Sequence, residues 1–355
     1  MANFDLKKGI RVIGLMSGTS LDGLDLCYVR FKYDGKWEYK ISKAVSWPYP
    51  DNIKDSLANA QSMSALEYAQ FNSEYGIYLG QQTAAFIQKY KLKPDLIASH
   101  GHTIFHRPEI RFTAQIGSGA GIVAETGVDC VCDFRTTDVA LYGQGAPLVP
   151  IGDRSLFEEY DYCLNMGGFS NISFNEGGER KAYDISPVNY VLNYYTRQIG
   201  KEYDKDGEMA GSGKVDKALL CALNGLDFYV KRGPKSLGRE WVETEVIPLI
   251  DSYHLTTEDI LCTFCEHVAI QIGNQIKGGK VLLTGGGAFN KYLVKRMSAV
   301  APWCNYHIPD KQTINFKEAL IFALLGAMYV ADMPNCLSSV TGASRDNIGG
   351  CLYKA

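Results

Sequence analysis

The chain has 355 residues, of which 46% are hydrophobic and 21% charged, and its formal net charge is −3 at pH 7. This length exceeds one compact core and fits two domains, and the composition is that of an ordinary soluble globular protein. The slightly acidic balance argues against a nucleic-acid footprint, and the lack of an apolar run of about 18 residues predicts no membrane span. The amino terminus has no apolar signal-peptide core, so we expect a cytoplasmic protein.

The first part of the chain has the order strand, strand, strand, helix, strand. Apolar runs separated by turn residues indicate the strands, and a serine at 62 or 64 can cap the long helix. This order is typical of a ribonuclease-H-like lobe. The predicted strands are 10–16, 24–31, 37–42, 96–98, 112–116 and 128–132, and the predicted helix is 65–91.

The second part of the chain repeats this plan, because residues 162–174 again read as strand, glycine turn, strand. The repetition predicts two lobes of similar topology: an N-terminal lobe of residues 1–140 with about 333–355, and a C-terminal lobe of 141–332. Residues 201–245 are expected to form loops and short helices. The remaining predicted elements are strands 182–185 and 281–284 and helices 188–199, 258–277 and 318–331, with Thr256 as a cap.

Three glycine turns follow apolar strands, at 17–23, 166–168 and 285–287. Glycine lets backbone N–H groups approach an anionic oxygen closely. The first turn also carries Asp22 and Asp25, which would repel a phosphate unless a cation stood between them. The pattern therefore indicates a metal–nucleotide complex, whereas neither a P-loop nor a dinucleotide-binding motif is present.

The segment from Gly14 to Gly23 has the sequence Gly-Leu-Met-Ser-Gly-Thr-Ser-Leu-Asp-Gly. This stretch resembles the phosphate-1 loop of the anhydro-N-acetylmuramic acid kinases, and similarity recurs along nearly the whole chain. The resemblance implies an α/β fold of two ribonuclease-H-like lobes around a nucleotide cleft, the actin-like ATPase fold. It assigns nucleotide binding to Gly18, Thr19, Ser20, Leu21, Asp22, Gly23, Gly167, Gly168, Gly285, Gly286 and Gly287, and makes Asp22 and Asp25 candidates for Mg²⁺.

Three further stretches hold candidate substrate residues. His100, His102 and His106 invite a metal site, but the family has a substrate-contacting glutamine where this chain has His102. Arg135 is a natural partner for the lactyl carboxylate of a muramic acid, or else pairs with a neighbouring aspartate. Glu318 matches a family glutamate near the sugar, or is simply the first turn of a helix. The substrate-binding residues implied by the resemblance are His102, Gln115, Arg135, Gln144 and Glu318.

Asp184 ends an apolar strand beside a proline turn and is the candidate catalytic base. The matching family motif is Asp-Thr-Gly-Pro-Gly-Asn, in which the aspartate activates water. Here Ile185, Ser186 and Val188 depart from that motif, which puts the substrate in question. Without the resemblance, Asp184 could equally be a helix cap.

The resemblance implies an ATP- and Mg²⁺-dependent kinase that acts on 1,6-anhydro-N-acetylmuramic acid, a small amino sugar from cell-wall turnover. Water opens the anhydro ring while the sugar is phosphorylated at O6, and the product is N-acetylmuramic acid 6-phosphate. A cytoplasmic homodimer is implied, with no membrane or nucleic-acid partner. Two alternatives stay open: a kinase of the same fold for another amino sugar without hydrolysis, and a non-catalytic sensor that binds ATP or muropeptides.

Overall fold

In the computed structural model, which describes residues 5–18, 21–231 and 235–355, the chain forms two compact units. Unit 1 comprises Met1–Leu156 and Phe316–Ala355, and unit 2 comprises Phe157–Asn315. The predicted lobe boundaries need correction, because 141–156 and 316–332 belong to unit 1. A buried ion pair shows why: Lys317 Nζ lies 2.7 Å from Asp153 Oδ1, which joins these two segments.

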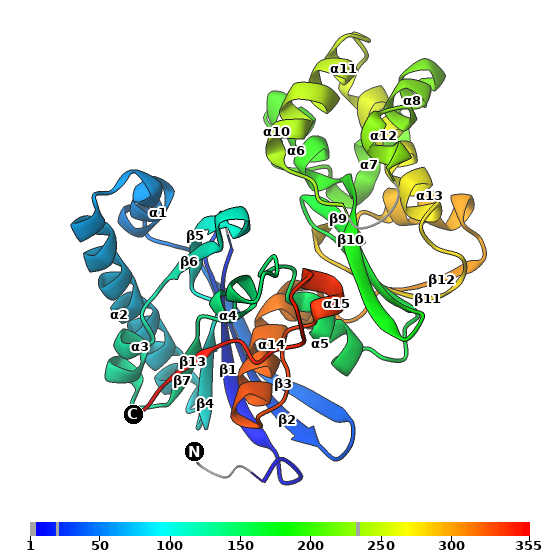
Figure 1. Ribbon diagram of the computed structural model, residues 1–355. Helices are drawn as coiled ribbons and strands as arrows, with labels where there is room; N and C mark the ends of the chain where they lie inside the picture. Colours follow the sequence, from blue (N-terminus) through cyan, green and yellow to red (C-terminus); the bar gives the residue numbers. More distant parts are fainter. Residues whose placement is uncertain (1–4, 19–20, 232–234) are drawn as a thin grey trace. The chain divides into compact units, whose positions relative to one another are not determined.

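Unit 1 contains a six-stranded sheet in the order β13-β7-β4-β1-β2-β3 (Figure 1). Strands β1, β2 and β3 form an antiparallel meander, and β1, β4 and β7 are parallel. In chain order, the first five strands of this sheet (β1, β2, β3, β4 and β7) therefore have the predicted ribonuclease-H-like topology, and β5 and β6 form a separate two-stranded sheet. The strands of unit 1 are β1 (Ile10–Ser17), β2 (Leu24–Tyr33), β3 (Trp37–Trp47), β4 (Leu96–Ser99), β5 (His102–Arg107), β6 (Phe112–Ile116), β7 (Cys130–Cys132) and β13 (Cys351–Tyr353).

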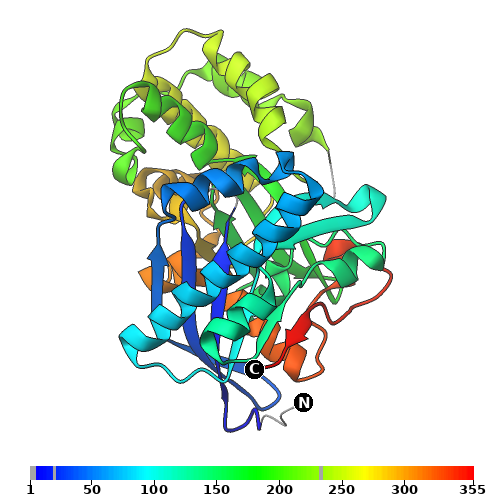
Figure 2. The same ribbon diagram turned by 90° about the vertical axis from the view of Figure 1, so that its left-hand side faces the viewer.

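Helices cover both faces of this sheet. Figure 1 shows α2 on one side of β1 and α14 on the other, and α2 crosses in front of the strands in Figure 2. Helix α2 begins with a complete capping box between Ser64 and Glu67, so one of the two candidate cap residues is confirmed. The helices of unit 1 are α1 (Asp51–Asn59), α2 (Ala65–Tyr90), α3 (Gly119–Thr126), α4 (Thr136–Ala140), α5 (Val149–Leu156), α14 (Lys311–Val330) and α15 (Ser338–Thr341). Helix α14 belongs to unit 1 from Phe316 onward.

Strand β1 presents alternate residues to the two helical layers, as the strand period requires. Ile13 and Leu15 belong to the apolar core that includes Tyr75 of α2. Gly14 points to the opposite face, where a Cβ would overlap the backbone carbonyl of Ala319 in α14. The missing side chain thus lets the backbone of α14 lie directly against the strand.

Unit 2 repeats the topology with a five-stranded sheet in the order β10-β9-β8-β11-β12. Strands β8, β9 and β10 are antiparallel neighbours, and β11 runs parallel to both β8 and β12. Both units thus have the predicted ribonuclease-H-like strand order. The strands are β8 (Tyr162–Met166), β9 (Phe169–Glu176), β10 (Glu179–Pro187), β11 (Gly279–Thr284) and β12 (Cys304–His307).

The helices of unit 2 pack around α12, which begins at the predicted cap Thr256 and is almost entirely buried. Cys262 and Cys265 are buried on this helix, form no disulfide and belong to its packed face. The helices are α6 (Asn189–Gln198), α7 (Glu208–Ser212), α8 (Lys217–Asn224), α9 (Asp227–Val230), α10 (Arg239–Trp241), a π-helical segment (Val242–Val246), α11 (Ile247–Asp251), α12 (Thr257–Gly273) and α13 (Lys291–Val300).

Helix α14 is longer than the predicted helix 318–331. It starts at Lys311 because Asp310 accepts hydrogen bonds from the backbone N–H groups of Gln312 and Thr313, which caps the helix. Among the described residues, it is the one helix long and apolar enough to span a membrane. However, 72% of its apolar window is buried inside the protein, as in a core helix.

The contact at Gly14 predicts a large loss of stability for Gly14→Ala, because the new methyl group would force α14 away from β1. Overpacking of this kind costs about 3 kcal/mol. Chemical denaturation should show this decrease in the free energy of unfolding. Gly225→Ala is the matched control, because Gly225 has φ −85° and the nearest atom to its Cβ lies 3.4 Å away. Its effect should stay below about 1 kcal/mol, and equal effects at both positions would contradict the packing argument.

Candidate active site

The first glycine turn connects β1 to β2 in unit 1. Ser17 and Leu24 are paired at its base, and the N–H of Leu21 donates to the Gly18 carbonyl oxygen across it (3.2 Å). A Cβ on Gly23 would overlap the backbone oxygen of Trp47, so this glycine is required for packing. The predicted nucleotide-binding residues Thr19 and Ser20 lie outside the described residues.

Ser17, at the end of β1, is the centre of a buried hydrogen-bond cluster. Its Oγ accepts from the hydroxyl groups of Tyr49 (2.7 Å) and Tyr75 (2.9 Å) and lies 2.7 Å from His102 Nδ1. Burial lowers the pKa of His102 to about 4, so the ring is neutral at pH 7. His102 is therefore anchored to the strand that enters the glycine turn.

Two carboxylates of the predicted metal pair meet a third one in unit 1. Burial raises the pKa of Asp25, and the charge of Asp22 raises it further. The pKa of Glu318 is raised mainly by loss of hydration and then by Asp25, although its side chain still reaches solvent. Glu318 lies in the middle of α14, so the alternative that it occupies a first helical turn is wrong. Burial and neighbouring negative charge thus disfavour ionisation of Asp25 and Glu318, but the described residues contain no group of three such side chains placed to bind a metal.

Arg135 does not form the alternative ion pair with Asp133, whose carboxylate accepts from Thr136 instead. Its Nε and one terminal nitrogen face His100 Nε2 at 3.1 and 2.8 Å, and the other terminal nitrogen donates to the Gly145 carbonyl oxygen at 2.6 Å. Burial lowers the pKa of Arg135 to about 10, so it remains a cation at neutral pH. Since a guanidinium has five N–H groups, two remain for a ligand.

The other predicted substrate residues of unit 1 differ in exposure. Gln115 donates from Nε2 to Thr113 Oγ1 (2.8 Å), while its buried Oε1 has no hydrogen-bond partner within the described part of the chain. Gln144 is exposed, and its backbone N–H donates to the Thr341 carbonyl oxygen. Gln115 thus offers an unused acceptor, and Gln144 offers a free side chain at the surface.

The second glycine turn connects β8 to β9 in unit 2. The backbone oxygens of Gly167 and Gly168 accept from N–H groups at the start of α6, which holds the turn against that helix. A Cβ on Gly168 would find its nearest atom 3.9 Å away, and one on Gly167 would find it 3.7 Å away. No crowding within the described chain requires glycine here, which is what a turn that admits a ligand would show.

The third glycine run is mixed in character. Gly285, with φ +77°, and Gly287 pack directly against Met166, where a Cβ would lie 2.7 Å from the nearest atoms. Gly286 instead lines a pocket of about 410 Å³, together with Asn189, Lys205 and other residues of unit 2. The 203–207 segment, which contributes to this pocket, belongs to the 201–245 stretch that was expected to form loops and short helices, and its composition is that of a surface turn.

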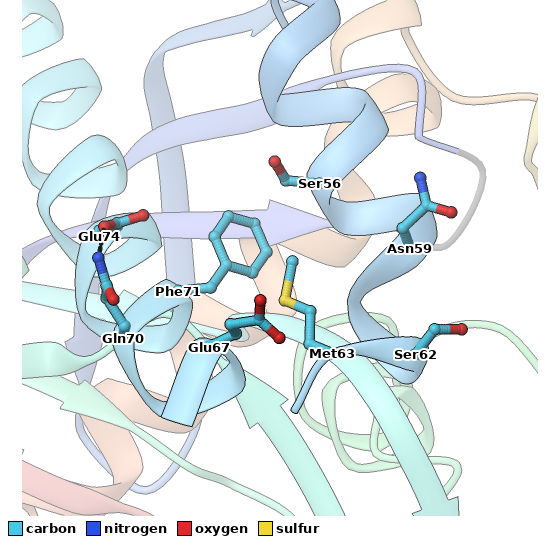
Figure 3. A pocket seen from close by; sticks show the side chains of 8 residues that line it. All are labelled: Ser56, Asn59, Ser62, Met63, Glu67, Gln70, Phe71 and Glu74. Atoms are coloured by element: carbon cyan, nitrogen blue, oxygen red, sulfur yellow. Dashed lines mark hydrogen bonds between the residues drawn. The ribbon is translucent and has the colours of Figure 1, made fainter. Parts of the chain in front are cut away.

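A second pocket, of about 440 Å³, lies between α1 and α2 in unit 1. Figure 3 shows Phe71 and Met63 in this pocket, with Glu67 beside Met63 and Glu74 farther to the side near Gln70. Glu67 belongs to the capping box of α2, and Glu74 accepts from Gln70 (2.7 Å). The pocket of unit 2 also has two carboxylates, Asp204 and Asp206, but Lys205 lines it as well, and Lys291 forms an ion pair with Asp206 (3.2 Å). Because these cations partly offset its acidic groups, this pocket is the better candidate for a nucleotide.

Asp184 is in β10, at a register shift between Asp184 and Ser186. Its Oδ2 accepts from the backbone N–H of Leu237 (2.8 Å), and its own N–H donates to the Lys235 carbonyl oxygen (2.9 Å). The carboxyl group is half-buried, and burial raises its pKa while the Leu237 hydrogen bond lowers it. Asp184 is not the cap of α6, so the alternative reading is wrong. A desolvated carboxylate with one free oxygen can act as a general base.

Several residues act here in ways that were not predicted: the tyrosine partners of Ser17, His100 as a partner of Arg135 rather than of a metal, and Lys235 and Leu237 as backbone partners of Asp184. Each acts through a contact between segments distant in sequence, so no local pattern could have indicated it. The alternative of a histidine metal site gains no support, because the described residues contain no group of three or more His, Cys, Asp or Glu side chains placed to bind a metal.

The chain was compared with known proteins. Among solved structures it is similar to the activator of the 2-hydroxyisocaproyl-CoA dehydratase from Clostridium difficile with bound ADPNP, at 12% identity and TM-score 0.44, over 91% of this chain and 96% of that chain. It is also similar to a ROK family glucokinase from Streptomyces griseus in complex with glucose and AMPPNP, at 10% identity and TM-score 0.39, over 90% and 99% of the two chains. The model of the anhydro-N-acetylmuramic acid kinase family matches residues 10–355, and the chain therefore belongs to that family.

Proposed function

We propose that this protein uses ATP to convert 1,6-anhydro-N-acetylmuramic acid into N-acetylmuramic acid 6-phosphate and ADP, with water opening the anhydro ring. The observation that carries the proposal is Asp184: a half-buried carboxylate at the position of the family's water-activating aspartate, in a chain that matches the family model over residues 10–355. We place the reaction in cytoplasmic peptidoglycan turnover and expect a homodimer.

The glycine turns would supply the nucleotide contacts. In unit 2, the uncrowded Gly167 and Gly168 would take the phosphates, and the pocket beside Gly286 would take the nucleoside. In unit 1, the turn from Gly18 to Gly23 would supply further contacts. Asp22 and Asp25 would hold Mg²⁺ directly or through water, and the repulsion that raises the pKa of Asp25 fits a cation there. The ion would neutralise phosphate charge.

Substrate contacts would come from unit 1. The two uncommitted N–H groups of Arg135 suit the lactyl carboxylate. Neutral His102, the free Oε1 of Gln115, Gln144 and Glu318 would contact the sugar's hydroxyl, acetamido and ether groups. Because His102 is anchored through Ser17, the sugar and the first phosphate turn would be positioned by the same strand.

The chemistry is then a coupled displacement. Asp184 takes a proton from water as the water oxygen bonds to C1 of the sugar. The C1–O6 bond breaks, and O6 attacks the γ-phosphoryl group, from which ADP departs. Atoms balance, since the product carries the elements of water and a phosphoryl group beyond the anhydro sugar.

The altered motif after Asp184 does not by itself argue against this reaction. Ile185 and Val188 are 1% and 0% exposed and belong to the core of unit 2, so they pack inward. The departures therefore change the support of the base rather than a surface offered to substrate.

The decisive test incubates the protein with MgATP and 1,6-anhydro-N-acetylmuramic acid, with N-acetylmuramic acid in parallel, in H₂¹⁸O. We expect ADP and a sugar phosphate that carries ¹⁸O at C1. Phosphorylation of N-acetylmuramic acid alone, or a product without ¹⁸O, would indicate a kinase without hydrolysis. ATP binding without product from either sugar would indicate a sensor. Evidence for a kinase without hydrolysis, or for a sensor, would overturn the proposal.

Asp184→Asn should lower kcat about 10²- to 10⁴-fold, because the amide cannot take a proton. In the wild type, kcat/KM should fall as the pH drops through the raised pKa of Asp184, since only the ionised form is a base. A raised pKa means that ionisation opposes folding above the pKa of the unfolded state. The variant's melting temperature at pH 7 should therefore not be lower than that of the wild type. Turnover close to wild type would remove Asp184 from the role.

Gly168→Ala should raise the KM for ATP about tenfold, equivalent to ~1.4 kcal/mol, because a methyl group would occupy space meant for phosphate. Its melting temperature should not change, since its φ lies outside the left-handed region and the nearest atom to the Cβ is 3.9 Å away. Gly285→Ala is the matched comparison: with φ +77° and a 2.7 Å approach to Met166, it should be destabilised by about 1–3 kcal/mol. An unchanged KM in Gly168→Ala would argue against a phosphate at this turn.

A further inference from the structure

The residue two positions after Asp184 is Ser186, which is held by hydrogen bonds from two sides. Ser186 is fully buried, and its carbonyl oxygen accepts from Ser170 Oγ (3.0 Å). Its hydroxyl faces the Pro187 carbonyl oxygen (2.9 Å) and the phenol oxygen of Tyr229 in α9 (3.3 Å). Ser186 is one of the residues at which this chain departs from the motif that the family resemblance implies.

Tyr229 is in turn fixed by His267 of α12. His267 Nδ1 lies 2.7 Å from Asn224 Oδ1, an oxygen that also accepts from Gln271 Nε2 (2.8 Å). Because that oxygen can only accept, Nδ1 carries the ring proton, and Nε2 accepts from the Tyr229 hydroxyl (2.9 Å). Burial lowers the pKa of His267 to about 3, so the ring stays neutral in any ordinary assay. The Tyr229 oxygen can then only accept from Ser186, whose single hydroxyl proton is shared between this oxygen and the Pro187 carbonyl oxygen.

The same helix reaches Asp184 by a second route. The ammonium group of Lys235 donates to the carbonyl oxygens of Phe228 (3.0 Å) and Lys231 (3.2 Å), at the end of α9. The backbone of the Lys235–Leu237 segment binds Asp184 on both its N–H and its Oδ2. Lys235 thus binds the end of α9 through its ammonium group and binds Asp184 of β10 through its backbone.

We propose that Tyr229, locked by His267, is a positioning residue that orients the carboxylate of Asp184. By fixing α9 against Ser186 and, through Lys235, against the 235–237 segment, it keeps the Leu237 N–H on Oδ2 and leaves Oδ1 for water. The inference rests on the proposed function in one respect, that Asp184 is the base. The contacts themselves are independent of the reaction.

Precise placement is what makes such a device matter. A general base must stay within hydrogen-bond reach of the proton that it takes, and a displacement of about 1 Å can cost 10²-fold in rate. Asp184 is followed by a register shift in β10, where the ladder does not hold the backbone regularly. The Tyr229 contact supplies the missing restraint at that point.

Tyr229→Phe tests the proposal, because it removes the hydroxyl and keeps the ring, which packs edge-on against Phe228 and Trp241. We expect kcat to fall about tenfold or more, with the KM for ATP unchanged. The acid limb of kcat/KM should move to higher pH, because a weakened Leu237 hydrogen bond no longer favours the ionised carboxylate. Tyr194→Phe is the control, since this tyrosine of α6 is 37% exposed, and it should match the wild type in all three measurements.

Ser186→Ala removes the hydroxyl at the other end of the contact and keeps the Cβ. It therefore tests the same contact even if the Tyr229→Phe variant does not fold. It should shift the acid limb in the same direction, and the double variant should be no worse than Tyr229→Phe, because both changes break one contact. A lower melting temperature with unchanged kcat and an unmoved acid limb would overturn the proposal and leave Tyr229 a packing residue.

A direct titration separates this inference from the proposed function. In protein with ¹³C-labelled aspartate, assigned by Asp184→Asn, the Asp184 carboxyl resonance reports its pKa without any substrate. A higher pKa in Tyr229→Phe than in the wild type would support the positioning role even if the sugar proved not to be a substrate. An identical pKa in both proteins would refute it, whatever the enzyme assays show.

Discussion

The close approach of α14 to β1 at Gly14 is the contact on which the candidate site of unit 1 depends. Because Gly14 has no side chain, the backbone at Ala319 reaches the strand, and its neighbour Glu318 enters the electrostatic field of Asp25 and Arg135. Residues far apart in sequence thus become one group of charges. The same helix is joined to α5 through the buried pair of Lys317 and Asp153, which explains why unit 1 extends beyond the predicted boundary.

Local signals in the sequence predicted much of the fold. The strands, the Ser64 and Thr256 caps and the repeated strand order depend on periodicity and capping within a few residues, which one sequence displays. The hairpin strand His102–Arg107 was not predicted, because its histidines indicated possible ligands rather than a strand. The start of α14 was missed because its first turns are polar, although Asp310 supplied a cap signal.

The site could be predicted as residue types but not as an arrangement. Three glycine turns were equivalent in sequence, yet Gly285 and Gly287 are required by their contacts with Met166, whereas Gly168 has open space around it. Only coordinates separate a glycine needed for packing from one that leaves room for a ligand. Likewise, the aspartate at 184 was visible, but its partner Leu237 lies in a segment whose composition indicates only a surface loop.

Burial and hydrogen bonding together explain how Ile185, Ser186 and Val188, the departures from the family motif, fit into the structure. Ile185 and Val188 extend the apolar core beneath the strand, and between them the hydroxyl of Ser186 meets Tyr229. Glycine residues in that motif would leave the loop free to bend, whereas here side chains restrain it. The Ser186 hydroxyl lies within hydrogen-bond distance of both the Pro187 carbonyl oxygen and the Tyr229 hydroxyl, so its burial does not leave it unpaired. The segment after Asp184 is therefore supported by α9 and α12 as well as by its own backbone.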